Sequence, residues 1–340
     1  MTEPLLITST QNPKIKRLLE LQQKSSERRK SGLFVVEGRR ELEHCLAAGY
    51  EVESVYVRMT NDESRGMTND ESRFARNDES KLPSNPEGNH HSSFVTRHSS
   101  LKEDSSFVIR HSSLKGEADD SSFVIRNSSF FYVAPNVYER IAYRGSTEGI
   151  VAIVRAKHLT LESLSLAALP PTRGAGRGAV ESEPPLFIVL ESVEKPGNLG
   201  AVLRSADAAG ATAVIVCDPL TDLYNPNLIR ASIGACFTMP TVACSSEECI
   251  AFLKKHGVQI LTAQLQDSKL YYDTPMTGPT AIVMGTESTG LTDVWREAAD
   301  AHIRIPMLGR LDSLNVSVSA AILLFEAVRQ RQNNETGNHE

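Results

Sequence analysis

Five polar residues in the second half of the chain stand where they could act on a phosphate or a hydroxyl group. They are Asn198, Arg204, Glu287, Ser313 and Asn315. A guanidinium has a pKa above about 12, so Arg204 is a poor base near neutral pH. It could instead bind a phosphate and stabilise an alkoxide as the negative charge develops. A base role for Arg204 would need a special environment, which the sequence does not reveal.

Each of these residues also has an ordinary structural interpretation. Asn198 could cap a helix that carries Arg204 on its surface. Glu287 could be an acidic residue in the first turn of a helix. Ser313 and Asn315 could form a plain turn. The residue types alone therefore leave the choice between function and structure open.

The five residues lie beside segments that should form regular structure. Apolar runs at 186–193 and 281–284 fit buried strands of a parallel sheet. A helix is expected at about 199–209, and a last helix at 316–330 carries Val318, Ile322, Phe325 and Val328 along one face. Open α/β sheets bind ligands at the carboxyl ends of their strands, so the loops after these strands are where a ligand is expected.

The chain divides into two expected domains. Strand and helix patterns alternate through 186–330, which predicts an α/β domain with a parallel sheet covered on both faces. Residues 1–156 contain strands near 32–37 and 52–57 around a helix, and they predict a smaller α/β domain. Residues 157–185 are rich in proline and glycine and read as a linker, and 331–340 as a disordered tail.

Four short motifs, in this order, resemble those of the SpoU (TrmH) family of RNA 2′-O-ribose methyltransferases, in the SPOUT superfamily. The chain has N-x-G-x-x-x-R, G-x-E-x-x-G, I-P-M and S-L-N, carried by Asn198, Gly200 and Arg204, by Glu287, by Ile305, Pro306 and Met307, and by Ser313, Leu314 and Asn315. One such motif is weak, but four in order are specific. The family's first loop often reads D-P-x-N, and here Lys195 replaces the acid, which puts the loop's salt bridges in doubt.

The resemblance implies an enzyme that uses S-adenosylmethionine to methylate a ribose 2′-hydroxyl in RNA. It implies that the five polar residues above are catalytic. It assigns cofactor binding to Gly285, Ile305, Met307 and Leu314. It further implies a deep trefoil knot in the carboxyl-terminal domain and a homodimer with the last helix at a two-fold interface.

The first domain resembles the substrate-binding domain that precedes the catalytic domain in many of these enzymes, which is similar to ribosomal protein L30e. The net charge of −6 means that positive charge for RNA must be segregated. Residues 1–40 are basic, and the RNA-binding candidates are Lys14, Lys16, Arg17, Arg28, Arg29 and Arg39. A basic helix is, however, often only a solvated face.

Residues 59–129 interrupt the resemblance with a low-complexity repeat. MTNDESR occurs at Met59 and again at Met67, and its polar composition cannot bury enough apolar surface to offset the entropy of ordering. Histidines recur with the repeat, so a metal site there is not expected. We predict a disordered or partly ordered insertion whose removal, over 60–128, leaves the fold and activity intact.

The five cysteines form no C-x-x-C pair, and their apolar surroundings favour buried free thiols over disulfides or zinc. No metal is expected. The amino terminus lacks the pattern of a secretory signal, and no apolar run is long enough to cross a membrane, so a cytoplasmic location is expected.

The leading hypothesis is a methyltransferase acting on 23S ribosomal RNA, because of the L30e-like first domain. A transfer RNA substrate is the near alternative, and a non-catalytic RNA-binding protein of the same fold is a second. A nicotinamide-dependent enzyme is disfavoured, because no G-x-G-x-x-G follows a strand.

Overall fold

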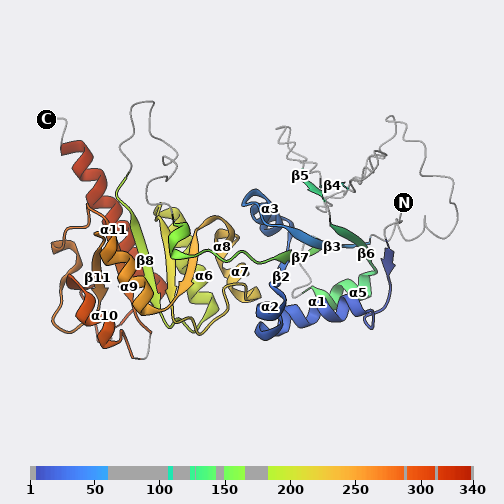
Figure 1. The fold of residues 1–340 in the computed structure, drawn as a ribbon, viewed down its shortest axis with the longest axis horizontal. Coiled ribbons are helices and arrows are strands. Elements are labelled where there is room, and N and C mark those ends of the chain that lie inside the picture. Colours follow the sequence, from blue (N-terminus) through green and yellow to red (C-terminus); the bar gives the residue numbers. More distant parts are fainter. Residues whose placement is uncertain are drawn as a thin grey trace. The chain divides into compact units, whose positions relative to one another are not determined.

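The computed structural model describes residues 5–59, 106–109, 123–126, 128–142, 149–164, 183–286, 289–310 and 313–337 of the 340-residue chain. The chain forms two compact units, Met1–Arg155 and Ala156–Glu340. Figure 1 shows both units and labels many of their elements. Each unit is considered by itself below.

The first unit is built on a five-stranded mixed sheet in the order β1-β6-β3-β7-β2. Strand β7 runs antiparallel to both of its neighbours, whereas β6 runs parallel to β1 and β3. The elements are β1 (Leu5–Ile7), α1 (Pro13–Gln23), α2 (Ser25–Ser31), β2 (Leu33–Glu37), α3 (Arg39–Ala47), β3 (Val52–Arg58), β6 (Ser129–Val133), α5 (Pro135–Ile141) and β7 (Ile150–Arg155). The small α/β domain expected from the sequence is confirmed.

Helix α1 shows why the basic segment folds as it does. The side chain of Asn12 accepts a hydrogen bond from the Lys14 amide at 2.9 Å, and Pro13 occupies the first helical position. The apolar residues Ile15, Leu18 and Leu21 are buried, so the lysines and arginines between them point outward. One amphipathic helix thus supplies both core contacts and a basic surface.

Strands β3 and β6 pair in parallel, with Ser54 opposite Ser129 and Arg58 opposite Val133. The chain that leaves β3 must therefore return along the sheet before it enters β6. The predicted deletion of 60–128 is wrong as stated, because parallel neighbours need a crossover connection of a dozen or more residues. Within the repeat, β4 (Ser106–Ile109) and β5 (Phe123–Arg126) form a separate antiparallel pair, and most of the repeat lies outside the described residues.

The second unit contains a seven-stranded sheet, in the order β10-β9-β8-β13-β11-β14-β12, and all its pairs are parallel. The predicted parallel α/β domain is confirmed. Its elements are η2 (Leu161–Ser163), β8 (Leu186–Glu191), α6 (Pro196–Ala208), β9 (Ala213–Cys217), α7 (Pro226–Ser232), α8 (Ala235–Thr238), β10 (Thr241–Cys244), α9 (Ser246–Lys255), β11 (Gln259–Ala263), β12 (Lys269–Leu270), η3 (Tyr271–Asp273), β13 (Thr280–Met284), α10 (Asp293–Ala298), β14 (Ala301–Arg304) and α11 (Val316–Gly337).

Helices cover both faces of this sheet. Side chains from alternate positions of β8, β9 and β13 form one core with α6, α7 and α11, and the other positions form a second core with α9 and α10. A Cβ at Gly200 would lie 2.7 Å from the Ala231 Cβ and 2.8 Å from the Leu228 carbonyl oxygen. The glycine of the first motif therefore lets α6 pack closely on α7.

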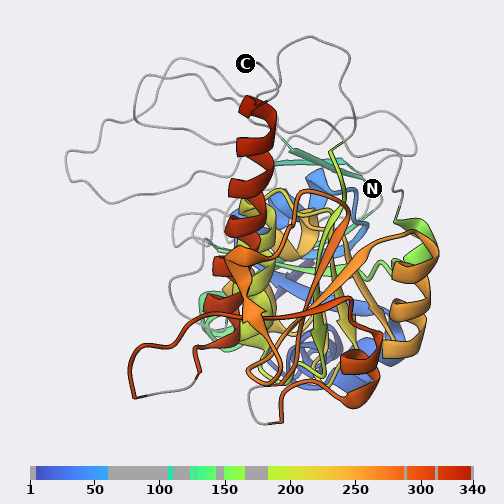
Figure 2. The same cartoon turned by 90° about the vertical axis from the view of Figure 1, so that its left-hand side faces the viewer.

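Two predicted boundaries differ from the structure. Leu161 and Leu164, expected in the linker, are buried in the second core, and Leu159 pairs with Val242 of β10. The predicted linker outside the described residues, 165–182, is not placed. Helix α11 continues to Gly337 (Figure 2), so the prediction of a disordered tail is wrong for residues 331–337.

The helix continues because the Arg331 side chain is held by backbone carbonyls on neighbouring segments. It donates hydrogen bonds to the carbonyl oxygens of Pro184, Pro185, Met276 and Gly278. These carbonyls precede β8 and β13, so Arg331 joins α11 to the amino ends of two central strands. The local sequence around Arg331 gives no indication of these carbonyl partners.

Candidate active site

A hollow opens at the carboxyl ends of β8 and β13, beside the first turn of α6. Its volume is about 130 Å³, and it is lined by Leu190, Glu191, Ser192, Val193, Glu194, Lys195, Asn198, Gly285, Thr286 and Val316. The residues come from the end of β8 with its following loop, the start of α6, the loop after β13, and the start of α11. This is the edge of the sheet at which the sequence predicted a ligand.

Asn198 and Asn315 meet at this hollow although 117 positions separate them, and Asn315 Nδ2 donates a hydrogen bond to Asn198 Oδ1 at 3.2 Å. The Asn315 Oδ1 accepts hydrogen bonds from the amide and the hydroxyl of Ser317, at 2.9 and 2.6 Å. Because a backbone amide can only donate, these bonds fix which way the Asn315 amide faces. Asn315 thus holds the start of α11 and joins it to the start of α6.

Asn198 is the third residue of α6 rather than a loop residue, because the helix begins at Pro196, three positions before the predicted start. Arg204 follows six positions later, about 9 Å along the helix axis, and its side chain is exposed. Within the part of the chain that the structure describes, no hydrogen bond or ion pair engages its guanidinium. Arg204 is not one of the residues that line the hollow.

The loop after β13 closes on itself. Thr286 and Gly290 exchange backbone hydrogen bonds of 3.2 and 3.1 Å, and Gly290 has a φ of +70°. A Cβ at Gly285 would lie 2.2 Å from the Gly290 carbonyl carbon, so only glycine fits there. The predicted catalytic residue Glu287 lies in this loop but outside the described residues.

The other predicted cofactor residues surround the site less closely. Ile305 and Met307 are partly buried, and Ile305 packs on the core beneath α11. Leu314 is 42% exposed, and Ser313 beside it is exposed as well. Of the four predicted cofactor residues, Gly285 lines the hollow and the other three do not.

Glu191 is a wall residue that the sequence analysis did not single out. Its side chain is buried, and its two carboxylate oxygens accept hydrogen bonds from the Thr292 amide at 2.9 Å and hydroxyl at 2.6 Å. It thereby fixes the start of α10, which follows the Gly285 loop. The signal was an acidic residue at the end of an otherwise apolar strand.

The six predicted RNA-binding residues divide into two groups. Lys14, Lys16, Arg17 and Arg29 are exposed, with the Lys14 ammonium 4.6 Å from the centre of the Phe131 ring and Arg17 paired with Glu53 at 2.9 Å.

Arg28 and Arg39 are buried, and the expectation that they form an RNA surface is wrong. Arg28 donates hydrogen bonds to the carbonyl oxygens of Leu21 and Gln22, at the carboxyl end of α1. Arg39 pairs with Glu43 at 2.5 Å, one turn along α3. Both guanidiniums are therefore engaged by the fold of the first unit.

The chain shares sequence along both units with known proteins. The SpoU rRNA Methylase family model matches residues 185–325, and the MRM3-like substrate binding domain model matches residues 12–80. A protein of Pseudomonas syringae pv. tomato, named 23S rRNA (guanosine-2'-O-)-methyltransferase RlmB, is 37% identical over 188 residues, which cover 55% of this chain and 72% of that protein. The chain belongs to the SpoU rRNA methylase family.

Two further similar proteins agree with this assignment. The RlmB protein of Pseudomonas putida is 41% identical, and the alignment spans 44% of this chain but 60% of that protein, less than two thirds of its length. A crystal structure of an RNA 2'-O ribose methyltransferase covers 96% of this chain and 100% of its own, with 32% identity and a TM-score of 0.62. The four motifs therefore lie on a fold that is similar to that of an RNA 2'-O ribose methyltransferase.

Proposed function

We propose that this SpoU family protein transfers a methyl group from S-adenosylmethionine to a ribose 2′-hydroxyl of 23S ribosomal RNA. The observation that carries the proposal is the hydrogen bond between Asn198 and Asn315, which joins the first and last motifs beside the hollow. The names of the relatives, RNA 2'-O ribose and 23S ribosomal RNA methyltransferases, supply the substrate class.

The walls of the hollow fit a cofactor that is bound by backbone groups. The chain at Gly285 passes too close to Gly290 for any side chain, which leaves main-chain groups at the end of β13 to face a ligand. Gly285, Thr286 and the 305–307 and 314 segments would hold the adenosine and methionine parts. S-adenosylmethionine supplies an electrophilic methyl group on a sulfonium, and such a transfer depends chiefly on in-line placement of the nucleophile.

Arg204 and the two asparagines would act on the RNA. An exposed guanidinium without a described partner can bind the target phosphate in a bidentate manner. Its fixed charge would also stabilise the ribose oxygen as that oxygen loses its proton. The Asn198–Asn315 pair would hold α6, and with it Arg204, in a constant position relative to the cofactor loops. Glu287 and Ser313, from the second and fourth motifs, are retained as proposed catalytic residues.

The first unit would bind parts of the RNA other than the nucleotide that is methylated. Lys14, Lys16, Arg17 and Arg29 put four exposed cations on α1 and α2, and phosphate contacts of this kind supply most non-specific affinity for RNA. Ribosomal RNA is proposed because the matched relatives are named for it. The same charges would suit transfer RNA, so the assay must compare the two.

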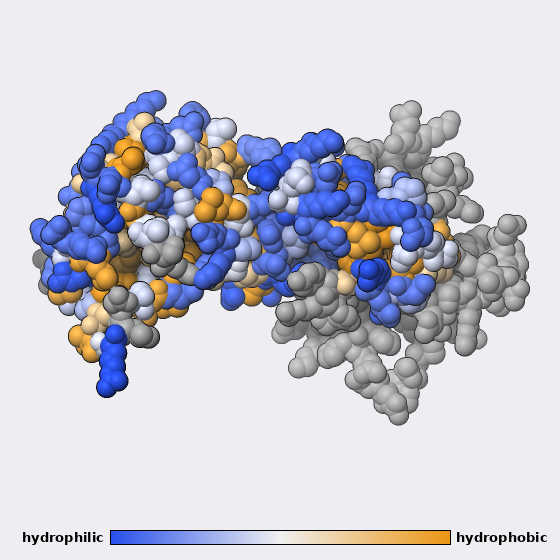
Figure 3. Space-filling model, turned by 90° about the horizontal axis from the view of Figure 1, so that it is seen from below, coloured by the Kyte–Doolittle hydropathy of each residue, from blue (hydrophilic) through white to orange (hydrophobic). Residues whose placement is uncertain are grey.

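A homodimer is proposed from the outer face of α11. Val318 and Phe325 are 47% and 48% exposed, although the opposite face of the same helix is fully buried. Apolar side chains also reach the surface of the second unit between polar ones on the face in Figure 3. An exposed apolar helix face is a surface that a two-fold interface, the commonest symmetric assembly, would bury.

Two finer features of the family are carried over as proposals. A deep trefoil knot in the second unit is carried over from the family resemblance. A cytoplasmic location is proposed for an enzyme that acts on ribosomal RNA. In the described part of the chain, no helix has both the length and the apolar content that a membrane span requires.

A single-turnover methylation assay tests the function. The full chain would be incubated with radiolabelled S-adenosylmethionine and with unmodified ribosomal or transfer RNA, and the labelled ribose would be mapped. Arg204→Ala should lower the rate by two to three orders of magnitude, the usual loss for one preorganised charge contact, while cofactor affinity stays within about twofold. Arg204→Lys should restore little, because lysine cannot reproduce the planar fork.

The matched control is Arg296→Ala. Arg296 is an exposed arginine on α10 of the same unit, with a surface ion pair to Asp293 at 3.3 Å. Its removal should leave turnover near wild type. Label on transfer RNA alone would overturn the ribosomal substrate, absence of transfer to any RNA would overturn the enzyme, and an Arg204→Ala rate above half of wild type would overturn the role of Arg204.

A further inference from the structure

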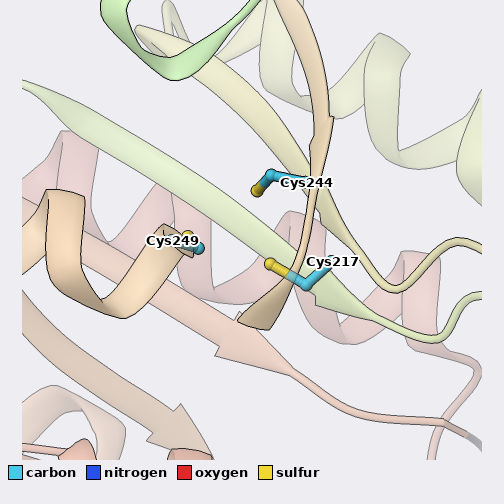
Figure 4. A group of neighbouring side chains, drawn as sticks. All are labelled: Cys217, Cys244 and Cys249. Atoms are coloured by element: carbon cyan, nitrogen blue, oxygen red, sulfur yellow. The ribbon is translucent and has the colours of Figure 1, made fainter. Parts of the chain in front are cut away.

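Three cysteines from separate parts of the sequence meet in the second unit. Cys217 ends β9, Cys244 ends β10, and Cys249 lies in the second turn of α9. Their sulfur atoms all lie within 4.8 Å of one another, and Figure 4 shows the three side chains directed into the same space. The sequence could not have shown this, because the spacing of 27 and 5 residues fits no compact metal motif.

The cluster lies outside the residues that line the hollow, although Cys217 is the register partner of Glu191 in its wall. Cys217 and Cys249 belong to the core beneath α9 and α10, whereas Asn198 and Val316 lie on the other face of the sheet, with α6 and α11. Cys217 and Cys244 are register partners on adjacent parallel strands, so their side chains project from the same face. None of the three takes part in the proposed methyl transfer.

From this geometry we propose that Cys217, Cys244 and Cys249 bind a single thiophilic metal ion of the Zn²⁺ type through three thiolates. Three atoms within 4.8 Å of one another share a point no farther than about 2.8 Å from each, against the roughly 2.3 Å of a zinc–thiolate bond. An inward movement of about 0.5 Å per sulfur would complete the three bonds. Thiolate sulfur selects Zn²⁺ and Cu⁺ over harder ions.

The surroundings hold the cysteines in place and admit an ion. The Asp218 carboxylate accepts hydrogen bonds from the Ser246 amide at 3.2 Å and hydroxyl at 2.6 Å, which ties the end of β9 to the start of α9. The Trp295 indole donates to the same hydroxyl at 3.0 Å. Cys217 and Cys249 are fully buried, while Cys244 is only partly buried and provides the way in and a position for a fourth ligand, water.

A Zn²⁺ ion would neutralise two of the three thiolate charges. Binding releases the three thiol protons, and three thiolates with Zn²⁺ carry a net charge of −1. Cys249 is the fourth residue of α9, a ten-residue helix, so the positive end of the helix dipole lies beside the site and favours this charge. No oxidant is required, in contrast to disulfide formation between any two of the sulfurs.

Metal binding by the tag-free full chain tests the site. The reduced, chelator-treated protein would be titrated with Zn²⁺, and bound metal would be counted by elemental analysis after gel filtration. We expect one ion per chain, with X-ray absorption giving three sulfur neighbours at about 2.3 Å. Titration with Co²⁺ should produce a thiolate charge-transfer band.

Cys244→Ser is the informative variant, because this residue is partly exposed and serine is close to it in size. It should weaken Zn²⁺ binding at least 100-fold and remove the charge-transfer band. Cys236→Ser is the matched control, since Cys236 is a partly buried cysteine of the same unit outside the cluster. It should bind like wild type.

Three results would overturn the proposal. The first is fewer than three sulfur neighbours around the ion bound to wild type, which does not depend on any variant folding. The second is equal affinity of wild type and Cys244→Ser. The third is reduced, chelator-treated wild type that takes up no Zn²⁺.

Discussion

The side chain of Arg331 should make a large contribution to the stability of the second unit. Its Nη1 donates to the Pro184 carbonyl oxygen at 2.6 Å, and its Nη2 donates to Gly278 at 2.9 Å and Pro185 at 3.3 Å. Its Nε donates to the Met276 carbonyl oxygen at 3.1 Å. One guanidinium thus connects the last turns of α11 to the segments that lead into β8 and β13.

The Arg331→Lys substitution keeps the positive charge but replaces the planar fork by a single point. A lysine ammonium cannot reach the carbonyls of both segments at once, so about two of the four hydrogen bonds should be lost. A hydrogen bond to a charged group contributes roughly 1.5–3 kcal/mol net to stability. Because the bonds of Arg331 are partly open to water, we expect the free energy of unfolding to fall by about 3 kcal/mol for the two lost bonds. For a domain of this size, that lowers Tm by roughly 6–12 °C.

The chain provides its own reporter for this measurement. It has one tryptophan, Trp295, which is fully buried in the second unit, so tryptophan fluorescence follows the unfolding of that unit alone. Arg329→Lys is the matched control. The exposed Arg329 pairs with Glu326 at 2.7 Å, and a lysine can retain that ion pair. It should therefore leave Tm nearly unchanged.

A shift for Arg331→Lys no larger than that for Arg329→Lys would refute the reasoning, because it would mean that the four carbonyls are satisfied as well by water. Removal of residues 331–340 provides a second test of the same reasoning. If these residues were the disordered tail that the sequence suggested, their removal would leave Tm unchanged, whereas the structure predicts a loss at least as large as that of Arg331→Lys.

Two further predictions concern the site and the assembly. Gly285→Ala should weaken S-adenosylmethionine binding more than tenfold in calorimetry, because its Cβ would lie 2.2 Å from the Gly290 backbone and displace the loop. The control is Gly257→Ala, at a glycine of positive φ with open space around it. Equal cofactor affinities of the two variants would contradict the assignment of the site. Phe325→Glu should convert a dimer to a monomer in light scattering at micromolar concentration, because the side chain is 48% exposed on the outer face of α11, and a monomeric wild type would contradict the interface.

The strands and the site loops were predictable from the sequence because their signals are local. Strand β8 is apolar up to its last residue, Glu191, β13 is apolar after Thr280, and all their residues are buried. The loops follow these strands directly, and their motifs are contiguous. The contact between Asn198 and Asn315 was beyond local reasoning, since only the tertiary fold joins α6 to α11.

The errors arose where a side chain has a distant partner. Arg28 reads as one more basic residue of a charged segment, but its guanidinium binds carbonyls six and seven residues earlier, which closes the end of α1. Arg331 likewise reads as part of a polar terminus, because the carbonyl groups that it binds are distant in the sequence. The cysteine cluster depends on the register of β9 against β10, and no spacing in the sequence encodes that register.

The last prediction concerns the repeat between β3 and β6. The chain leaves β3 after Arg58 and must enter β6 at Ser129, which lies level with Ser54, about 13 Å back along the sheet at 3.3 Å per residue. Both ends are anchored: the Met59 amide donates to the Val133 carbonyl at 2.9 Å, and the Ser128 hydroxyl donates to Val52. A direct fusion of 59 to 128 cannot span this distance.

Replacement of 60–127 by a flexible linker of about 14 glycine and serine residues should preserve the first unit, because parallel strands need a crossover of about a dozen residues and nothing more specific. The pair β4–β5 is lost in this variant, but an isolated two-stranded sheet contributes little stability. Hydrogen exchange read by mass spectrometry should show wild-type protection in β3, β6 and β7 of the linker variant. The direct fusion, as control, should lose protection in β6. Loss of protection in both variants would mean that the repeat itself stabilises the sheet, and that its low complexity conceals a structural role.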